Sequence, residues 1–179
     1  MFNALEIFDA AITVIALGYI FRNYFRTPVT EFAPAGSNRR QILNAALIVA
    51  PAVLLHEFVH KFVAMGFGFL ATYRAAYEWL ILGVFLSYFR FPFVFFVPAY
   101  VSIIGAGPSW AFALVAISGP LTNLALYGIS DIVTRFELVK GNNYLYFHVF
   151  KHINKWLFLF NLIPLPGTDG YNFINSLLR

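Results

Sequence analysis

The sequence predicts an all-α membrane protein, a polytopic helical bundle, and three observations support that prediction. Of its 179 residues, 60% are hydrophobic and only 11% are charged. The mean hydropathy is +0.73, far above that of a soluble domain. Several windows reach the ~20 apolar residues that cross a bilayer, and short charged or Pro/Gly-marked breaks separate them. We therefore expect a single membrane-embedded domain over residues 1–179.

Composition also excludes several kinds of function. The chain has no cysteine, which rules out disulfides, thiolate metal ligands and a cysteine nucleophile. The net charge of +4 is spread over the loops, and no long basic run is present. Nucleic acid is therefore not an expected partner, whereas the lipid bilayer is.

The first third of the chain is expected to hold two spanning helices. Residues 4–21 form an apolar window without the basic beginning and small-residue cleavage site of a signal peptide, so we interpret it as a retained helix. Residues 22–41 contain Pro, Gly, Ser and Asn and are expected to form a polar loop. Residues 42–69 form the second window.

The remainder is less regular. Residues 75–89 predict a helix that is short for a span, and residues 91–107 predict an irregular or β-like re-entrant segment, because they are aromatic, β-branched and broken by Pro and Gly. Residues 109–129 predict a third span. After a charged loop, a further span is expected from about Trp156, breaking at residues 161–170 before a short final helix.

The string HEFVH lies inside the second window. On an α-helix, His56 and His60 share a face, so both imidazoles can bind one ion. Glu57, beside the first histidine, could take a proton from an attacking water without being a ligand. In hydrocarbon these groups would face a severe desolvation penalty unless they bound or paired with something, which favours a zinc site over a chance match.

A catalytic zinc ion usually has three protein ligands, so HEFVH requires one more donor. Asp169 is the best candidate, because it lies in PLPGTDG at the broken end of the last span. Glu78 and Asp131 are weaker candidates with nothing distinctive around them.

A second histidine pair, His148 and His152, has the same spacing in HVFKH. It lacks the carboxylate, and Lys151 between the two would repel a cation. We interpret these residues as interfacial histidines in a charged loop that water reaches.

Three motifs in this order carry a resemblance: HEFVH at 56–60, GPLTN at 119–123 and NLIPLPGTDG at 161–170. With them the chain resembles the site-2 protease family of intramembrane zinc metalloproteases, here without a PDZ-like insert. The resemblance covers residues 42–179, which would be the three-helix catalytic core, and residues 1–41 would be a leading helix and loop.

The resemblance implies roles for individual residues. It implies one zinc ion per chain, bound by His56, His60 and Asp169, with Glu57 as the general base. One departure is Thr168, where the family commonly has Leu, so we expect a looser loop there. The resemblance also implies a substrate-binding set, namely Asn161, Pro164, Pro166 and Asn123.

The leading hypothesis is therefore an intramembrane zinc endopeptidase, multi-pass in the cell membrane, that cuts transmembrane segments of other proteins. A zinc transporter or metal-binding membrane protein would explain the histidines but not Glu57. An inactive relative acting as an adaptor would usually have lost a ligand or the base. The sequence does not indicate an oligomeric state.

Two smaller features and the orientation have alternative interpretations. Residues 91–104 could pair with an unwound substrate strand, or simply pack against lipid and helices. Gly119 and Pro120 favour close helix approach over substrate contact. The positive-inside rule places the 22–41 loop in the cytoplasm, whereas the resemblance places the HEFVH end of its helix there.

Overall fold

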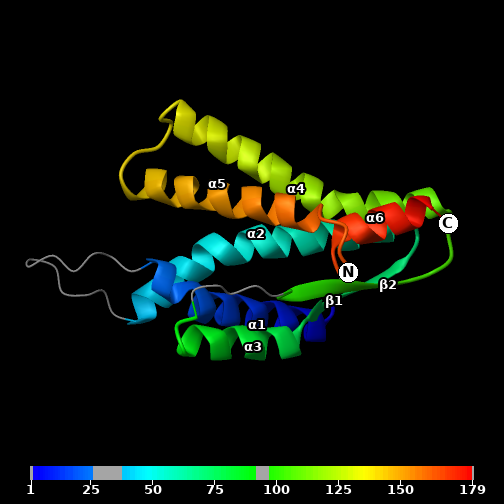
Figure 1. The fold of residues 1–179 in the computed structure, drawn as a ribbon, viewed down its shortest axis with the longest axis horizontal. Coiled ribbons are helices and arrows are strands. Elements are labelled where there is room, and N and C mark those ends of the chain that lie inside the picture. The colour runs from blue at the N-terminus through cyan, green and yellow to red at the C-terminus, as the bar shows by residue number, and fades with distance from the viewer. Residues whose placement is uncertain (1, 26–37, 92–96, 179) are drawn as a thin grey trace, which may run out of the picture. The chain divides into compact units, whose positions relative to one another are not determined.

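The fold is known from a computed structural model that describes residues 2–25, 38–91 and 97–178. It contains six α-helices, one 3-10 helix and two strands within these ranges (Figure 1). The chain forms two compact units. Unit 1 comprises Met1–Val53 and Tyr73–Tyr100, and unit 2 comprises Leu54–Thr72 and Val101–Arg179.

The helices and strands of the described residues occur in the following order along the chain. The helices of the first half are α1 (Ala4–Phe21), η1 (Arg22–Phe25), α2 (Asn38–Gly66) and α3 (Tyr77–Tyr88). The two strands, β1 (Leu70–Ala75) and β2 (Ala99–Ile104), pair in a two-stranded sheet. The remaining helices are α4 (Ser109–Arg135), α5 (Asn142–Asn161) and α6 (Asp169–Leu177).

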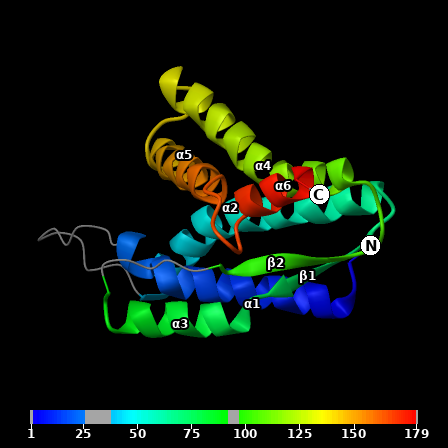
Figure 2. The same cartoon turned by 45° about the vertical axis from the view of Figure 1, so that its right-hand side comes forward.

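Unit 1 is built on α1, which lies side by side with α3 (Figures 1 and 2). Asn3 caps α1 through a reciprocal capping box with Glu6. The carboxylate of Glu6 also accepts the Tyr73 N–H at 2.7 Å, and that of Asp9 accepts the Ala75 N–H at 3.3 Å. The two acidic residues thus satisfy alternate backbone donors of β1, which explains why an apolar helix keeps two buried carboxylates.

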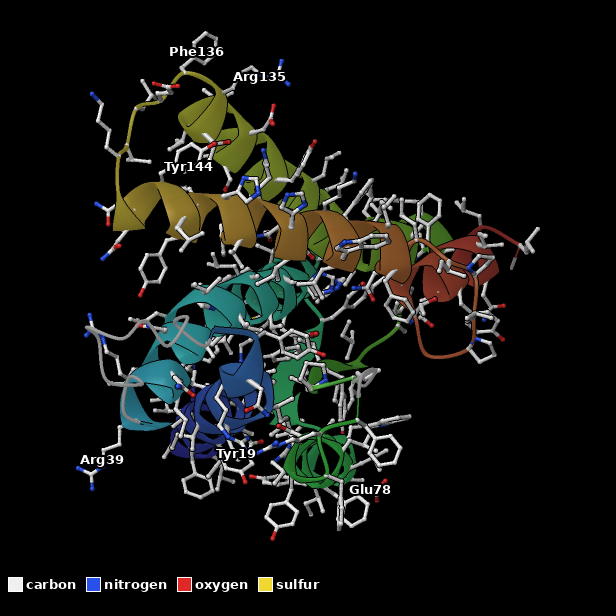
Figure 3. The ribbon with its side chains drawn as sticks, turned by 60° about the vertical axis from the view of Figure 1, so that its left-hand side comes forward. Tyr19, Arg39, Glu78, Arg135, Phe136 and Tyr144 are labelled. Atoms are coloured by element: carbon white, nitrogen blue, oxygen red, sulfur yellow. The ribbon has the colours of Figure 1, made fainter. Side chains whose placement is uncertain are left out.

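Unit 2 contains the C-terminal part of α2 together with α4, α5 and α6. Helices α4 and α5 form a hairpin, and α6 packs along α4 (Figure 1). At the turn of the hairpin, Arg135 and Phe136 project outward (Figure 3). Phe69 and Phe112 stack with ring centroids 4.6 Å apart and join a small core with Ala64 and Val115.

The predicted fold class is confirmed, because the chain is mostly helical and its only described sheet is small. Among the described residues, three helices are long and apolar enough to cross a membrane: Ala4–Tyr24, Arg39–Gly66 and Ser109–Arg135. They match the first three predicted spans. The predicted short helix is confirmed as α3, and part of the extended segment as β2. Residues 92–96 of that segment, and 26–37 of the polar loop, lie outside the described residues.

Two predictions for the second half were wrong. The helix expected from about Trp156 begins at Asn142, and it is not among the three helices that meet the length and hydropathy of a span. His148 and His152 therefore lie on α5 and not in a loop. The physical reason is that residues 142–155 are too polar to form an apolar window, but this part of α5 packs against α4, where Lys151 pairs with Asp131 at 3.3 Å.

Candidate metal centre

Helix α2 presents His56 and His60 one turn apart on one buried face. The two rings are edge-on, with centroids 4.7 Å apart, and their Nε2 atoms lie 3.1 Å from each other. Both side chains are only about 7% exposed. The helical spacing has therefore produced the paired nitrogen donors that the sequence predicts.

The third predicted ligand is Asp169, which is the first residue of α6. Thr168 caps this helix by accepting the Tyr171 N–H, and its hydroxyl lies 2.8 Å from the Leu165 carbonyl oxygen. Thr168 is buried, whereas residues 162–167 of the loop before it are exposed, so the looser loop expected at this position stays a prediction. A Cβ on Gly170 would lie 2.4 Å from the Leu162 carbonyl oxygen, so only glycine lets α6 start this close to the end of α5.

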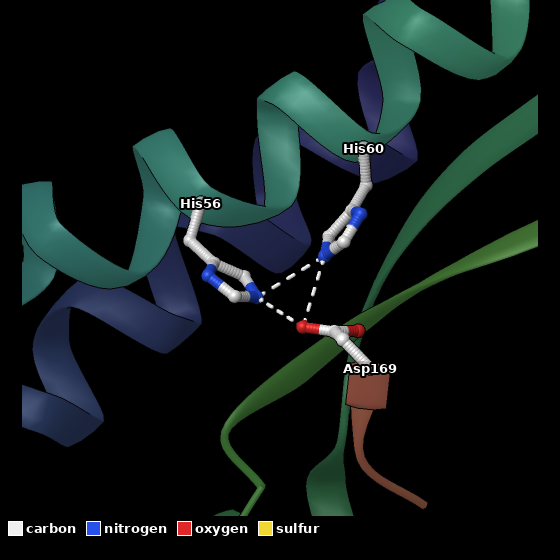
Figure 4. Close-up of side chains that lie close together, drawn as sticks. All are labelled: His56, His60 and Asp169. Carbon is white, nitrogen blue, oxygen red and sulfur yellow. Dashed lines mark hydrogen bonds and ion pairs between the residues drawn. The ribbon is translucent and has the colours of Figure 1, made fainter. Parts of the chain in front are cut away.

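The three side chains converge on one point (Figure 4). Asp169 Oδ2 lies 3.0 Å from His56 Nε2 and 3.3 Å from His60 Nε2. This oxygen is buried and makes no hydrogen bond of normal geometry. Burial alone would raise the pKa of the Asp169 carboxyl, but the two imidazoles lower that pKa to well below its usual range. Metal binding requires this carboxylate in its ionised form.

The spacing of these atoms fits a single metal ion. Ligands that bind one zinc-sized ion tetrahedrally at ~2.0–2.1 Å lie about 3.3 Å from one another. The three observed separations, 3.1, 3.0 and 3.3 Å, are close to that value. Three acceptor atoms at these distances repel one another unless a cation or protons lie between them, so the group is suited to a divalent ion.

The outer nitrogens of both rings are held as well. His60 Nδ1 donates to the Val115 carbonyl oxygen at 2.7 Å, and His56 Nδ1 donates to Asn123 Oδ1 at 2.5 Å. A neutral imidazole that donates through Nδ1 keeps its lone pair on Nε2. With Nδ1 as the donor in both rings, both Nε2 lone pairs can bind a metal ion that lies between them and Asp169. Hydrogen bonds to the outer nitrogen of a ligand histidine also orient its ring.

Gly119 explains how α4 passes the site. A Cβ at this position would lie 2.2 Å from His60 Nε2 and 2.7 Å from His56 Nε2. Both distances are shorter than any normal contact of a Cβ atom, so a methyl group would fill the space beside both ligand atoms. The absence of a side chain at Gly119 keeps this face open, in agreement with the interpretation of close helix approach.

Gly119→Ala is expected to lower metal affinity at least about 10-fold, because the imidazoles must move to accommodate the methyl group. Affinity is measured by competition with a chromophoric chelator. Gly128→Ala, on the same helix, is the matched control, since a Cβ there meets nothing within 4 Å. Equal affinities in the two variants would contradict the steric argument.

The other predicted site residues are placed as follows. Glu57 is buried on α2, and its carboxylate lies close enough to the two histidines and Asp169 to interact with them electrostatically. Asn161 ends α5, where its Nδ2 donates to the Leu157 carbonyl oxygen at 3.0 Å. Pro164 and Pro166 are exposed in the α5–α6 loop, whereas Asn123 is fully buried behind His56.

The two weaker ligand candidates have other surroundings. Glu78 is exposed in the first turn of α3 (Figure 3). Asp131 forms ion pairs with Arg135 at 2.9 Å and with Lys151 at 3.3 Å. Among the described residues, the group able to hold a metal ion consists of His56, His60 and Asp169.

Comparison with known proteins agrees with this chemistry. The chain is 32% identical over 173 residues to "Putative zinc metalloprotease MJ0611" of Methanocaldococcus jannaschii, which covers 94% of this chain and 83% of that protein. The chain belongs to this zinc metalloprotease family. It is also 36% identical over 80 residues to "Putative zinc metalloprotease YwhC" of Bacillus subtilis, which covers 40% of this chain and 36% of that protein. No protein-family model and no solved structure matches the chain.

For this zinc metalloprotease family member, sequence reasoning missed two groups near the centre. Val115 contributes a backbone carbonyl oxygen, for which side-chain patterns carry no signal. Asn154, fully buried on α5, accepts from Asn123 at 2.9 Å. Its helix face also carries Lys151 and Asn161, so no pattern in the sequence singled out Asn154.

Proposed function

We propose that the protein is an intramembrane zinc endopeptidase of the site-2 protease type. The observation that supports this most is the convergence of His56 Nε2, His60 Nε2 and Asp169 Oδ2, next to a buried Glu57. Family membership supports zinc and peptide hydrolysis. The three long apolar helices support a site within a multi-pass protein of the cell membrane.

In this proposal His56, His60 and Asp169 hold the zinc ion and leave one coordination position open. A bound zinc ion supplies Lewis-acid polarisation of the scissile carbonyl and lowers the pKa of water at the site to ~7. Glu57 accepts the proton of the attacking water and later delivers it to the leaving amine.

The substrate is proposed to approach the end of α5. Asn161 stands at the last helical residue, next to the exposed loop that carries Pro164 and Pro166. In substrate-bound protein the Asn161 amide would exchange its bond to the Leu157 carbonyl for one to the substrate backbone. A transmembrane substrate must unwind locally first, because a helix hides its peptide bonds in its own hydrogen-bond ladder.

Cleavage of a transmembrane reporter in proteoliposomes tests the proposal. We expect chelation to reduce cleavage to background and about one equivalent of zinc per chain to restore it. Zinc flux into sealed vesicles, measured in the same preparation, is expected to be absent. Cleavage that survives complete removal of the metal would contradict the proposal, and flux without cleavage would favour a transporter.

A further inference from the structure

A series of hydrogen bonds between buried side-chain amides extends from His56 into unit 2. His56 Nδ1 donates to Asn123 Oδ1, Asn123 Nδ2 donates to Asn154 Oδ1 at 2.9 Å, and Asn154 Nδ2 donates to the Phe150 carbonyl oxygen at 2.8 Å. Both asparagines are fully buried, at 0% exposure. This series of hydrogen bonds links α2, α4 and α5. The proposed reaction gives Asn154 no role of its own.

The end of this series sets its direction. The Phe150 carbonyl oxygen can only accept, so it requires the NH2 group of Asn154 and turns Asn154 Oδ1 toward Asn123. That oxygen in turn requires the NH2 group of Asn123, which leaves Asn123 Oδ1 facing His56. Each amide is thus fixed in one of its two possible orientations.

The orientation of Asn123 matters for the metal. If its amide were reversed, the NH2 group would face His56 Nδ1, which would then have to accept, and the ring proton would move to Nε2. A protonated Nε2 has no lone pair for a metal ion. The orientation of the Asn123 amide therefore bears on whether His56 can be a ligand, and the bond to Asn154 Oδ1 favours the orientation that leaves Nε2 of His56 without a proton.

We propose that Asn154 is a positioning residue that holds His56 in its metal-binding tautomer through Asn123. This inference rests on the proposed function, since it concerns the same metal. Asn154 does not touch the ion; it prevents the Asn123 amide from reversing. Loss of an outer hydrogen bond of this kind typically lowers metal affinity about 10- to 100-fold.

The test compares zinc affinities, measured by chelator competition, and the visible absorption of the cobalt-loaded protein. Asn154→Leu is expected to lower affinity about 10- to 100-fold. Asn123→Asp in the Asn154→Leu background is expected to restore it, because a carboxylate presents only acceptors to His56 whichever way it is turned. A packing role for Asn154 would not be rescued by a change at position 123. Zinc affinity and cobalt absorption are also measured in Asn154→Ala, so that the result does not depend on whether Asn154→Leu folds.

Ser130→Ala is the matched control, since Ser130 is a buried hydroxyl on α4 that donates to the Leu126 carbonyl oxygen. Its affinity for zinc is expected to equal that of the wild type. Wild-type affinity in both Asn154 variants, or failure of Asn123→Asp to restore it, would overturn the inference. Wild-type protein that binds zinc and cuts no reporter would instead overturn the proposed function, and the affinity comparison would still be valid.

Discussion

Replacing Glu57 with Gln is expected to reduce cleavage of a transmembrane reporter by about 10²- to 10⁴-fold, the usual contribution of a general acid–base group. Gln has the same shape but cannot accept a proton from the attacking water. Because Glu57 is not one of the three converging side chains, zinc content is expected to stay at about one ion per chain. Initial cleavage rates in proteoliposomes and metal analysis of the same samples give the result.

Glu78→Gln provides the control for this experiment, because Glu78 is an exposed carboxylate on α3. Its rate is expected to equal that of the wild type. A Glu57→Gln protein that cuts at more than about a tenth of the wild-type rate would contradict the general-base role. Loss of zinc in that variant would instead indicate that Glu57 is a ligand.

Replacing Asp169 with Ala is expected to have the second large effect, the loss of tightly bound zinc. The change removes the oxygen that lies 3.0 and 3.3 Å from the two histidine nitrogens. We expect the affinity to fall by more than the ~10- to 100-fold typical of a lost outer hydrogen bond, because a direct ligand is removed. Zinc content after equilibration with a chelator is the measurement, and cleavage is expected to fall with it.

Asp131→Ala is the matched control, since Asp131 pairs with Arg135 and Lys151 in the same unit. It is expected to retain zinc and activity. Asp169 also stabilises the start of α6, an effect of about 0.3–1 kcal/mol for a carboxylate in the first helical turn. Thermal unfolding of the apo forms separates that contribution from metal loss. Retention of wild-type zinc affinity in Asp169→Ala would remove Asp169 from the ligand set.

Several features of the fold and of the metal centre follow from neighbouring residues in the sequence. The spacing of His56 and His60 fixes their shared face through helix geometry alone, and the placement of Asp169 was expected from motif order. Hydropathy located three long helices, because their apolar windows are continuous. These features depend on neighbours in sequence or on a motif.

The features that could not be predicted depend on partners distant in sequence. Helix α5 begins earlier than its hydropathy indicates, because its polar first half packs against α4, where Lys151 pairs with Asp131. Strand β1 was missed, since it is fixed by β2 and by carboxylates of α1 more than sixty residues earlier. The roles of Val115 and Asn154 exist only when three helices are assembled.

X-ray absorption at the zinc edge of metal-loaded wild-type protein tests the convergence of the ligands most directly. We expect scattering from two imidazole rings and from oxygen ligands, with metal–ligand distances of about 2.0–2.2 Å. Loss of this ordered first shell in Asp169→Ala is expected. A wild-type spectrum that shows one imidazole ligand or none would contradict the convergence of the three ligands. An Asp169→Ala spectrum identical to that of the wild type would also contradict it.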